Sequence, residues 1–265
     1  MTTLSIRSRV TRLLLALAVC APVATAQKPD KPKPDKEVAD RIEVLEDVLG
    51  DKKFTRDAEG IAAIDVLYQK HEAGLCEEDD ADIVKVLSKV LLKGKVRPAD
   101  KIALYDAAAH ALSQQGEAGA DVLQKAYDNK GRFKAKPEWV PLREKLLRAI
   151  GKTKDESKIK FLLDEARRSP EAALQAAAGE ALGNFEGSKE KVRKEIVGDL
   201  LVRYGSMSEK ANQIGSNIES QNARDRLAAL SGKWNETLKK LTGQDFDTFL
   251  EWQKWHNDNK NKDWQ

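Results

Sequence analysis

The chain has 265 residues, of which 34% are charged and 6% aromatic, and its formal net charge at pH 7 is +3. The only charged residues before Gln27 are three arginines, Arg7, Arg9 and Arg12, so a chain that begins at Gln27 has equal numbers of basic and acidic side chains. This balance excludes the global basic field that attracts nucleic acid or anionic lipid. We therefore expect no nucleic-acid partner.

Residues 1–26 have the features of a signal peptide. An arginine-containing start precedes an apolar run from Leu13 to Val19, and the small-x-small sequence that ends at Ala26 is typical of a cleavage site. The apolar run is too short to span a bilayer. We expect cleavage after Ala26, export to the periplasm or the medium, and no stable membrane insertion afterwards. Lipidation of Cys20 is the alternative, although Val19 stands where a lipobox has Gly, Ala or Ser.

The remaining chain is predicted to be all-α. Residues 27–37 are rich in proline and lysine and predict an extended linker. Beyond them, apolar residues recur at helical spacing and no stretch alternates as a strand would. The predicted helical segments are residues 38–49, 56–71, 83–91, 98–112, 122–127, 142–151, 159–166, 169–182, 192–204, 207–218 and 223–241. We expect one elongated domain over residues 38–243, followed by an aromatic capping helix and a polar tail over residues 244–265.

Three of these segments share one pattern of apolar positions, at i, i+3, i+4, i+7 and i+8, with Lys145 interrupting the second segment. The positions are Leu104, Ala107, Ala108, Ala111 and Leu112; Leu142, Leu146, Ala149 and Ile150; and Leu174, Ala177, Ala178, Ala181 and Leu182. The segments end 38 and then 32 residues apart, which is typical of repeated helix pairs.

The limits of the third segment also follow local rules. Ser169 is a good N-cap and Pro170 suits the first helical position. Gly183 and Asn184 predict a C-terminal cap with positive φ. Alanines on the buried face predict close approach of a neighbouring helix, so that Ala178 should be buried.

These paired helices, whose second member ends in Ala181-Leu182-Gly183 or a variant of it, resemble HEAT repeats over about residues 80–205. The terminal segment, with its aromatic residues and Asn/Lys tail, resembles the end of secreted bacterial HEAT-repeat proteins. The resemblance implies an armadillo-like α-solenoid, a right-handed superhelical stack of antiparallel helix hairpins. It also implies a protein-binding scaffold, which we expect to be a monomer and not an enzyme.

Few residues suggest chemistry. His71, His110 and His256 are not spaced as metal ligands, and no catalytic or nucleotide-binding motif occurs, so we expect no cofactor and no metal. We interpret the acidic run over residues 77–82 as the first turn of a helix, which its dipole favours, and a cation site is the alternative. His110 is interpreted as a surface residue.

The tryptophans near the C-terminus are the remaining candidates for binding. Trp252 and Trp255 are expected to pack on the helix that carries Trp234, and Phe246, Phe249 and Leu250 to cover the same flank. Trp264 is predicted to be exposed, beyond a frayed polar stretch over residues 257–262.

Trp255 and Trp264 are therefore the candidate partner-binding residues. Two other functions stay open beside protein binding. One is an enzyme-accessory role, because some HEAT-like proteins resemble bilin lyases. The other is glycan or cell-wall binding through these tryptophans.

Overall fold

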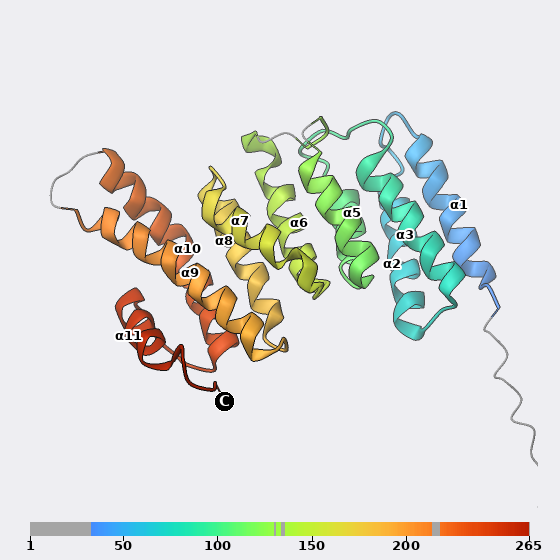
Figure 1. Ribbon diagram of the computed structural model, residues 1–265. Helices are drawn as coiled ribbons and strands as arrows, with labels where there is room; N and C mark the ends of the chain where they lie inside the picture. Colours follow the sequence, from blue (N-terminus) through green and yellow to red (C-terminus); the bar gives the residue numbers. More distant parts are fainter. Residues whose placement is uncertain (1–32, 130, 134–135, 214–217, 265) are drawn as a thin grey trace, which may run out of the picture. The chain divides into compact units, whose positions relative to one another are not determined.

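The computed structural model describes residues 33–129, 131–133, 136–213 and 218–264. These residues contain eleven α-helices and no β-strand, which confirms the all-α prediction (Figure 1). The helices are α1 (Lys36–Gly50), α2 (Asp57–Ala73), α3 (Glu77–Leu92), α4 (Ala103–Leu112), α5 (Gly116–Asp128), α6 (Val140–Lys152), α7 (Ile159–Arg168), α8 (Ala172–Leu182), α9 (Glu190–Ala211), α10 (Ile218–Thr242) and α11 (Phe249–Asn259). Single 3-10 turns occupy Pro137–Trp139, Glu156–Lys158 and Gly183–Phe185.

The helices from α1 to α10 contact one another in consecutive pairs. Each odd-numbered helix packs against the helix that follows it (Figure 1). Adjacent pairs are joined mainly by their even-numbered helices, because α2 contacts α4, α4 contacts α6, α6 contacts α8, and α8 contacts α10. The hydrophobic core lies inside and between these pairs, where the apolar faces are removed from water.

The three repeated apolar patterns lie in this core. Their side chains are buried in α4, α6 and α8, except that Ala107 is half-buried, and Ala178 is fully buried as predicted. Glycine and alanine let the even-numbered helices approach closely. A Cβ atom at Gly151 of α6 would lie 2.4 Å from the carbonyl oxygen of Ala181 in α8. One at Gly179 of α8 would lie 2.0 Å from Nε1 of Trp234 in α10.

Several predicted helix limits are wrong. Ser169 does not cap α8, because its N–H donates to the carbonyl oxygen of Glu165 and so ends α7; α8 begins at Ala172. Gly183 has a helical φ of −64° and leads into a 3-10 turn instead of a positive-φ cap. Pro98 also lies outside the helix predicted to begin there, since α4 begins at Ala103.

The described residues of the predicted helix 207–218 do not form a separate helix, and residues 214–217 lie outside the described part of the chain. Met207 and Ala211 belong to the last turns of α9, which continues unbroken from Glu190, and Ile218 begins α10. The end of α9 continues a longer buried face, because Leu200, Tyr204, Met207 and Ala211 are all buried, whereas Ile218 is 80% exposed. The α1 helix likewise begins before Val38, where the Asp35 side chain accepts the Glu37 N–H at 2.8 Å.

The capping segment contacts two helices. A Thr248–Glu251 capping box begins α11, which packs mainly on α9, whereas the segment before it reaches α10. In that segment, Asp245 pairs with Lys239 at 2.8 Å, and the Asp247 carbonyl oxygen accepts from Asn235 at 2.6 Å. The ring of Phe249 lies beside Tyr204, whereas Leu250 is 72% exposed, which contradicts its predicted covering role.

Candidate functional site

The two predicted partner-binding tryptophans lie in an aromatic cluster formed by α11 and the chain that follows it. Trp252 is fully buried, its ring centroid is 6.4 Å from that of Trp255, and the Trp255 centroid is 5.1 Å from that of Trp264. Trp264 is only 7% exposed, so its prediction as an exposed residue is wrong. Its indole N–H donates to the Asn259 carbonyl oxygen at 3.1 Å, and Lys194 Nζ lies 5.5 Å from its ring centroid.

This packing corrects the prediction of a frayed tail. The chain after Asn259 turns back so that the indole ring of Trp264 satisfies a carbonyl group at the end of α11. Lys194 of α9 fixes the turn by donating to the Lys262 carbonyl oxygen at 2.5 Å. Of the two candidates, Trp255 alone remains half-buried. The predicted cleavage site at Ala26 and the alternative lipid site at Cys20 lie outside the described residues.

The acidic run forms the first turn of α3, as interpreted from the sequence. The buried Asp79 carboxylate accepts the Asp35 backbone N–H at 2.9 Å and the Cys76 thiol at 3.2 Å. Asp80 lies 2.8 Å from Nδ1 of His71. Across the part of the chain that the structure describes, no group of three or more His, Cys, Asp or Glu residues could hold a metal ion.

A hollow of about 280 Å³ lies between α4 and α6, and we call it the middle hollow. It is lined by Asp106, Ala109, His110, Ser113, Lys145, Arg148, Ala149 and Lys152. An adjoining hollow toward α2 shares Asp106 and His110 with it. The exposed His110, predicted to be a surface residue, therefore lies where two hollows meet, with its ring centroid 5.1 Å from that of Tyr68.

Acidic side chains partner most cations of the middle hollow. Lys145 pairs with Asp106, and Arg148 donates to Glu144 at 3.0 Å and to Glu180 at 2.9 Å. Burial alone would raise the pKa of Glu180, but hydrogen bonds from Lys233 and Arg148 outweigh burial and lower it below its usual value. Lys145 and Arg148 of the middle hollow are thus held in place by carboxylates on α4, α6 and α8.

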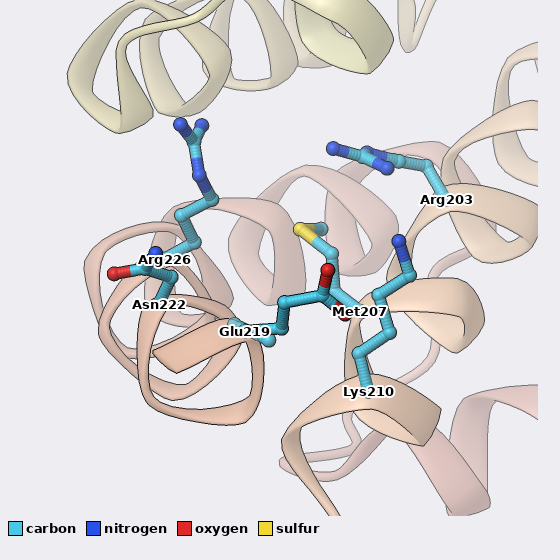
Figure 2. A pocket seen from close by; sticks show the side chains of 7 residues that line it. Arg203, Met207, Lys210, Glu219, Asn222 and Arg226 are labelled. Carbon is cyan, nitrogen blue, oxygen red and sulfur yellow. The ribbon is translucent and has the colours of Figure 1, made fainter. Parts of the chain in front are cut away.

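A second hollow, of about 240 Å³, lies between α9 and α10, and we call it the C-terminal hollow. It is lined by Arg203, Met207, Lys210, Glu219, Asn222, Ala223 and Arg226 (Figure 2). Figure 2 shows Arg203 and Lys210 extending from α9 on one side of the hollow, and Arg226 extending from α10 toward a neighbouring helix on the other. Glu219 is the one carboxylate among these lining residues.

The sequence prediction did not identify the C-terminal hollow. The signal was present on each helix, because Arg203, Met207 and Lys210 are spaced i, i+4 and i+7, and so share a face of α9. Glu219, Asn222 and Arg226 share a face of α10 in the same way. Only the pairing of α9 with α10 brings the two faces together.

None of the described helices has the length and apolarity needed to cross a bilayer. No family model, no curated protein and no solved structure matches the chain. The function is therefore inferred from the arrangement of the helices and from the residues that line the two hollows.

Proposed function

We propose that this chain is an exported, non-catalytic scaffold that binds another protein through an α-solenoid of HEAT-like helix pairs. The observation that supports this proposal best is the order in which the helices α1 to α10 contact one another. Each helix packs on its pair partner, and even-numbered helices join successive pairs. That order is the one expected of a stack in which each repeat contacts its neighbours. We further propose that the protein acts as a monomer.

The middle hollow is the proposed contact surface. It presents side chains from two successive pairs, and its ion-paired charges are held in defined positions. Charges fixed in this way favour one complementary partner and reject others more than they raise affinity. His110 and Lys152 are exposed at this surface.

Site-specific photo-crosslinking tests the proposal. A photo-reactive residue at His110 should give a discrete adduct with one protein of the envelope or secreted fraction. The same photo-reactive residue at Lys160 should give no such adduct, because Lys160 is exposed on α7, an odd-numbered helix that does not line the middle hollow. Lys152→Glu should suppress the His110 adduct by reversing a charge at the edge of the middle hollow. Equal labelling at the two positions, or an adduct unaffected by Lys152→Glu, would contradict a contact at this surface.

The proposed export rests on residues 1–26 and has its own test. The mass of the intact protein recovered from outside the cytoplasm should correspond to a chain that begins at Gln27. A chain that begins at a lipid-modified Cys20 would replace this proposal with membrane anchoring. Glycan binding by the tryptophans is the weaker alternative, because Trp252 and Trp264 are buried and so offer little ring surface to a sugar.

A further inference from the structure

Cations that bridge helices in this protein usually contact a carboxylate. The buried Arg97 of the loop before α4 donates to Asp57 of α2 at 2.8 Å, and Lys158 pairs with Asp121 at 2.5 Å. Arg203 is different. Within the described part of the chain it has neither an ion pair nor a hydrogen bond, and its Nε atom is buried without a partner. A guanidinium group in this state has donors available for a ligand.

Two further cations line the same hollow. Lys210 lies two turns after Arg203, is exposed and forms no ion pair with the described residues. Arg226 is held at the opposite wall, where it donates to Gln175 Oε1 at 3.2 Å and to the Pro170 carbonyl oxygen. These neutral partners fix the guanidinium group without cancelling its charge.

Electrostatics agree with this geometry. Burial, followed by the charges of Arg226 and Arg167, lowers the pKa of Arg203. Each of these effects opposes a charged Arg203, and the attraction of an anion in the hollow would offset them. With three cations and Glu219, the lining carries two net positive charges. The ligand that balances this lining is an oxyanion with two negative charges.

We infer that the C-terminal hollow between α9 and α10 binds a phosphate monoester group. At neutral pH this group has close to two negative charges and three acceptor oxygens. Guanidinium groups bind such oxygens through paired N–H donors, whereas a carboxylate has a single charge and would leave one cation unbalanced. Asn222 adds a side-chain amide to the lining, and Met207 and Ala223 supply its apolar part.

Isothermal titration calorimetry tests the inference with glycerol 3-phosphate as a free phosphate monoester. Vesicles of phosphatidylcholine with phosphatidic acid present the same group on a lipid. The purified protein should bind at least one probe saturably, and Arg203→Gln should weaken that binding about tenfold or more. Lys210→Gln should weaken it less, because the lysine is a more exposed point charge. Arg168→Gln is the matched control, since this arginine is exposed on α7 and does not line the hollow.

The possible outcomes show whether the phosphate group belongs to a free molecule or to a lipid, and whether the hollow binds phosphate at all. Binding of glycerol 3-phosphate indicates a free phosphorylated molecule, and binding of the vesicles alone indicates a lipid headgroup; either supports the inference. Lack of saturable binding to both probes would overturn it, as would affinities that Arg203→Gln and Lys210→Gln leave unchanged. Lys210→Gln keeps the test valid if Arg203→Gln misfolds, because Lys210 is exposed and unpaired within the described chain.

Discussion

The middle and the C-terminal hollows both contain several cations, but they differ in how those cations are balanced. Between α4 and α6, lysine and arginine side chains pair with Asp106, Glu144 and Glu180. Between α9 and α10, Arg203 has no partner among the described residues and Arg226 has only neutral ones. The first arrangement stabilises the contact between helix pairs, and the second leaves charge available for a ligand.

The packing beside the two hollows differs as well. Helices α6 and α8 meet through glycine and alanine, so their backbones are close and the charged residues at the rim can reach across. Beside the C-terminal hollow, the large ring of Tyr204 packs against those of Trp234 and Phe249. The apolar part of the hollow's lining is formed by Met207 and Ala223. The following predictions test this contrast, beginning with the largest effect.

A charge placed inside the tight α6–α8 region should be the most disruptive change. Ala178 is fully buried in α8, so Ala178→Glu would bury an unpaired carboxylate and should lower the free energy of unfolding by about 3–5 kcal/mol. Chemical denaturation measures this change. Ala229→Glu is the control, because Ala229 is exposed on α10 and should tolerate the charge. Similar losses for both variants would contradict the burial of Ala178.

Loss of the last aromatic ring should have the next largest effect. Trp264→Ala removes a buried indole, its hydrogen bond to Asn259 and its contact with Trp255, and should cost about 3 kcal/mol of stability. Thermal melting checks this, with Leu250→Ala as the control because Leu250 is 72% exposed. Removal of residues 258–265 should destabilise the protein too. Unchanged melting after either loss would restore the original prediction of an unpacked tail.

The helices were largely predictable from the sequence because each apolar face is a local pattern. The buried faces of α3, α4, α6 and α8 follow directly from residue spacing. Helix limits failed where two signals compete. Ser169 and Pro170 are typical of a helix start, yet the Ser169 N–H completes the last turn of α7.

The sites were less predictable, because their properties depend on distant residues. Trp264 is buried by contact with Lys194, which lies 70 positions earlier in the chain. Arg203 is distinctive only because the α9–α10 pairing brings it near Arg226 without giving it an ion pair among the described residues. Neither relation leaves a periodic signal in the sequence, so composition and spacing could not show them.

The ion pair between α6 and α8 should make the stability of the protein depend on pH. The pKa of Glu180 is lowered in the folded protein, from a reference value of 4.5, so its contribution is fully present above the unfolded pKa and is lost as pH falls through the lower folded pKa. Glu180→Gln should therefore cost about 0.5–1 kcal/mol at pH 7, a modest value because the side chain is 41% exposed. The difference from wild type should shrink between pH 7 and strongly acidic pH, as pH falls through the lowered folded pKa of Glu180. Denaturation at both pH values measures it, and a constant difference would exclude the ion pair as its cause.

The smallest predicted effect distinguishes the two hollows most directly. Arg148→Gln and Arg203→Gln make the same chemical change in each hollow. Arg148 loses its contacts with Glu144 and Glu180, so the variant should be destabilised by about 0.5–1 kcal/mol.

Arg203 has no ion pair to lose within the described chain, and burial and neighbouring arginines oppose its charge. Arg203→Gln should therefore leave the free energy of unfolding unchanged or raise it by a few tenths of a kcal/mol. The gain is small because the variant also loses packing by the aliphatic stem of the arginine. Denaturation at low salt should show a loss of stability for Arg148→Gln and none for Arg203→Gln, and 0.5 M NaCl should reduce the difference because salt screens both interactions. If Arg203→Gln loses as much stability as Arg148→Gln, then Arg203 has a structural role and its charge is not held for a ligand.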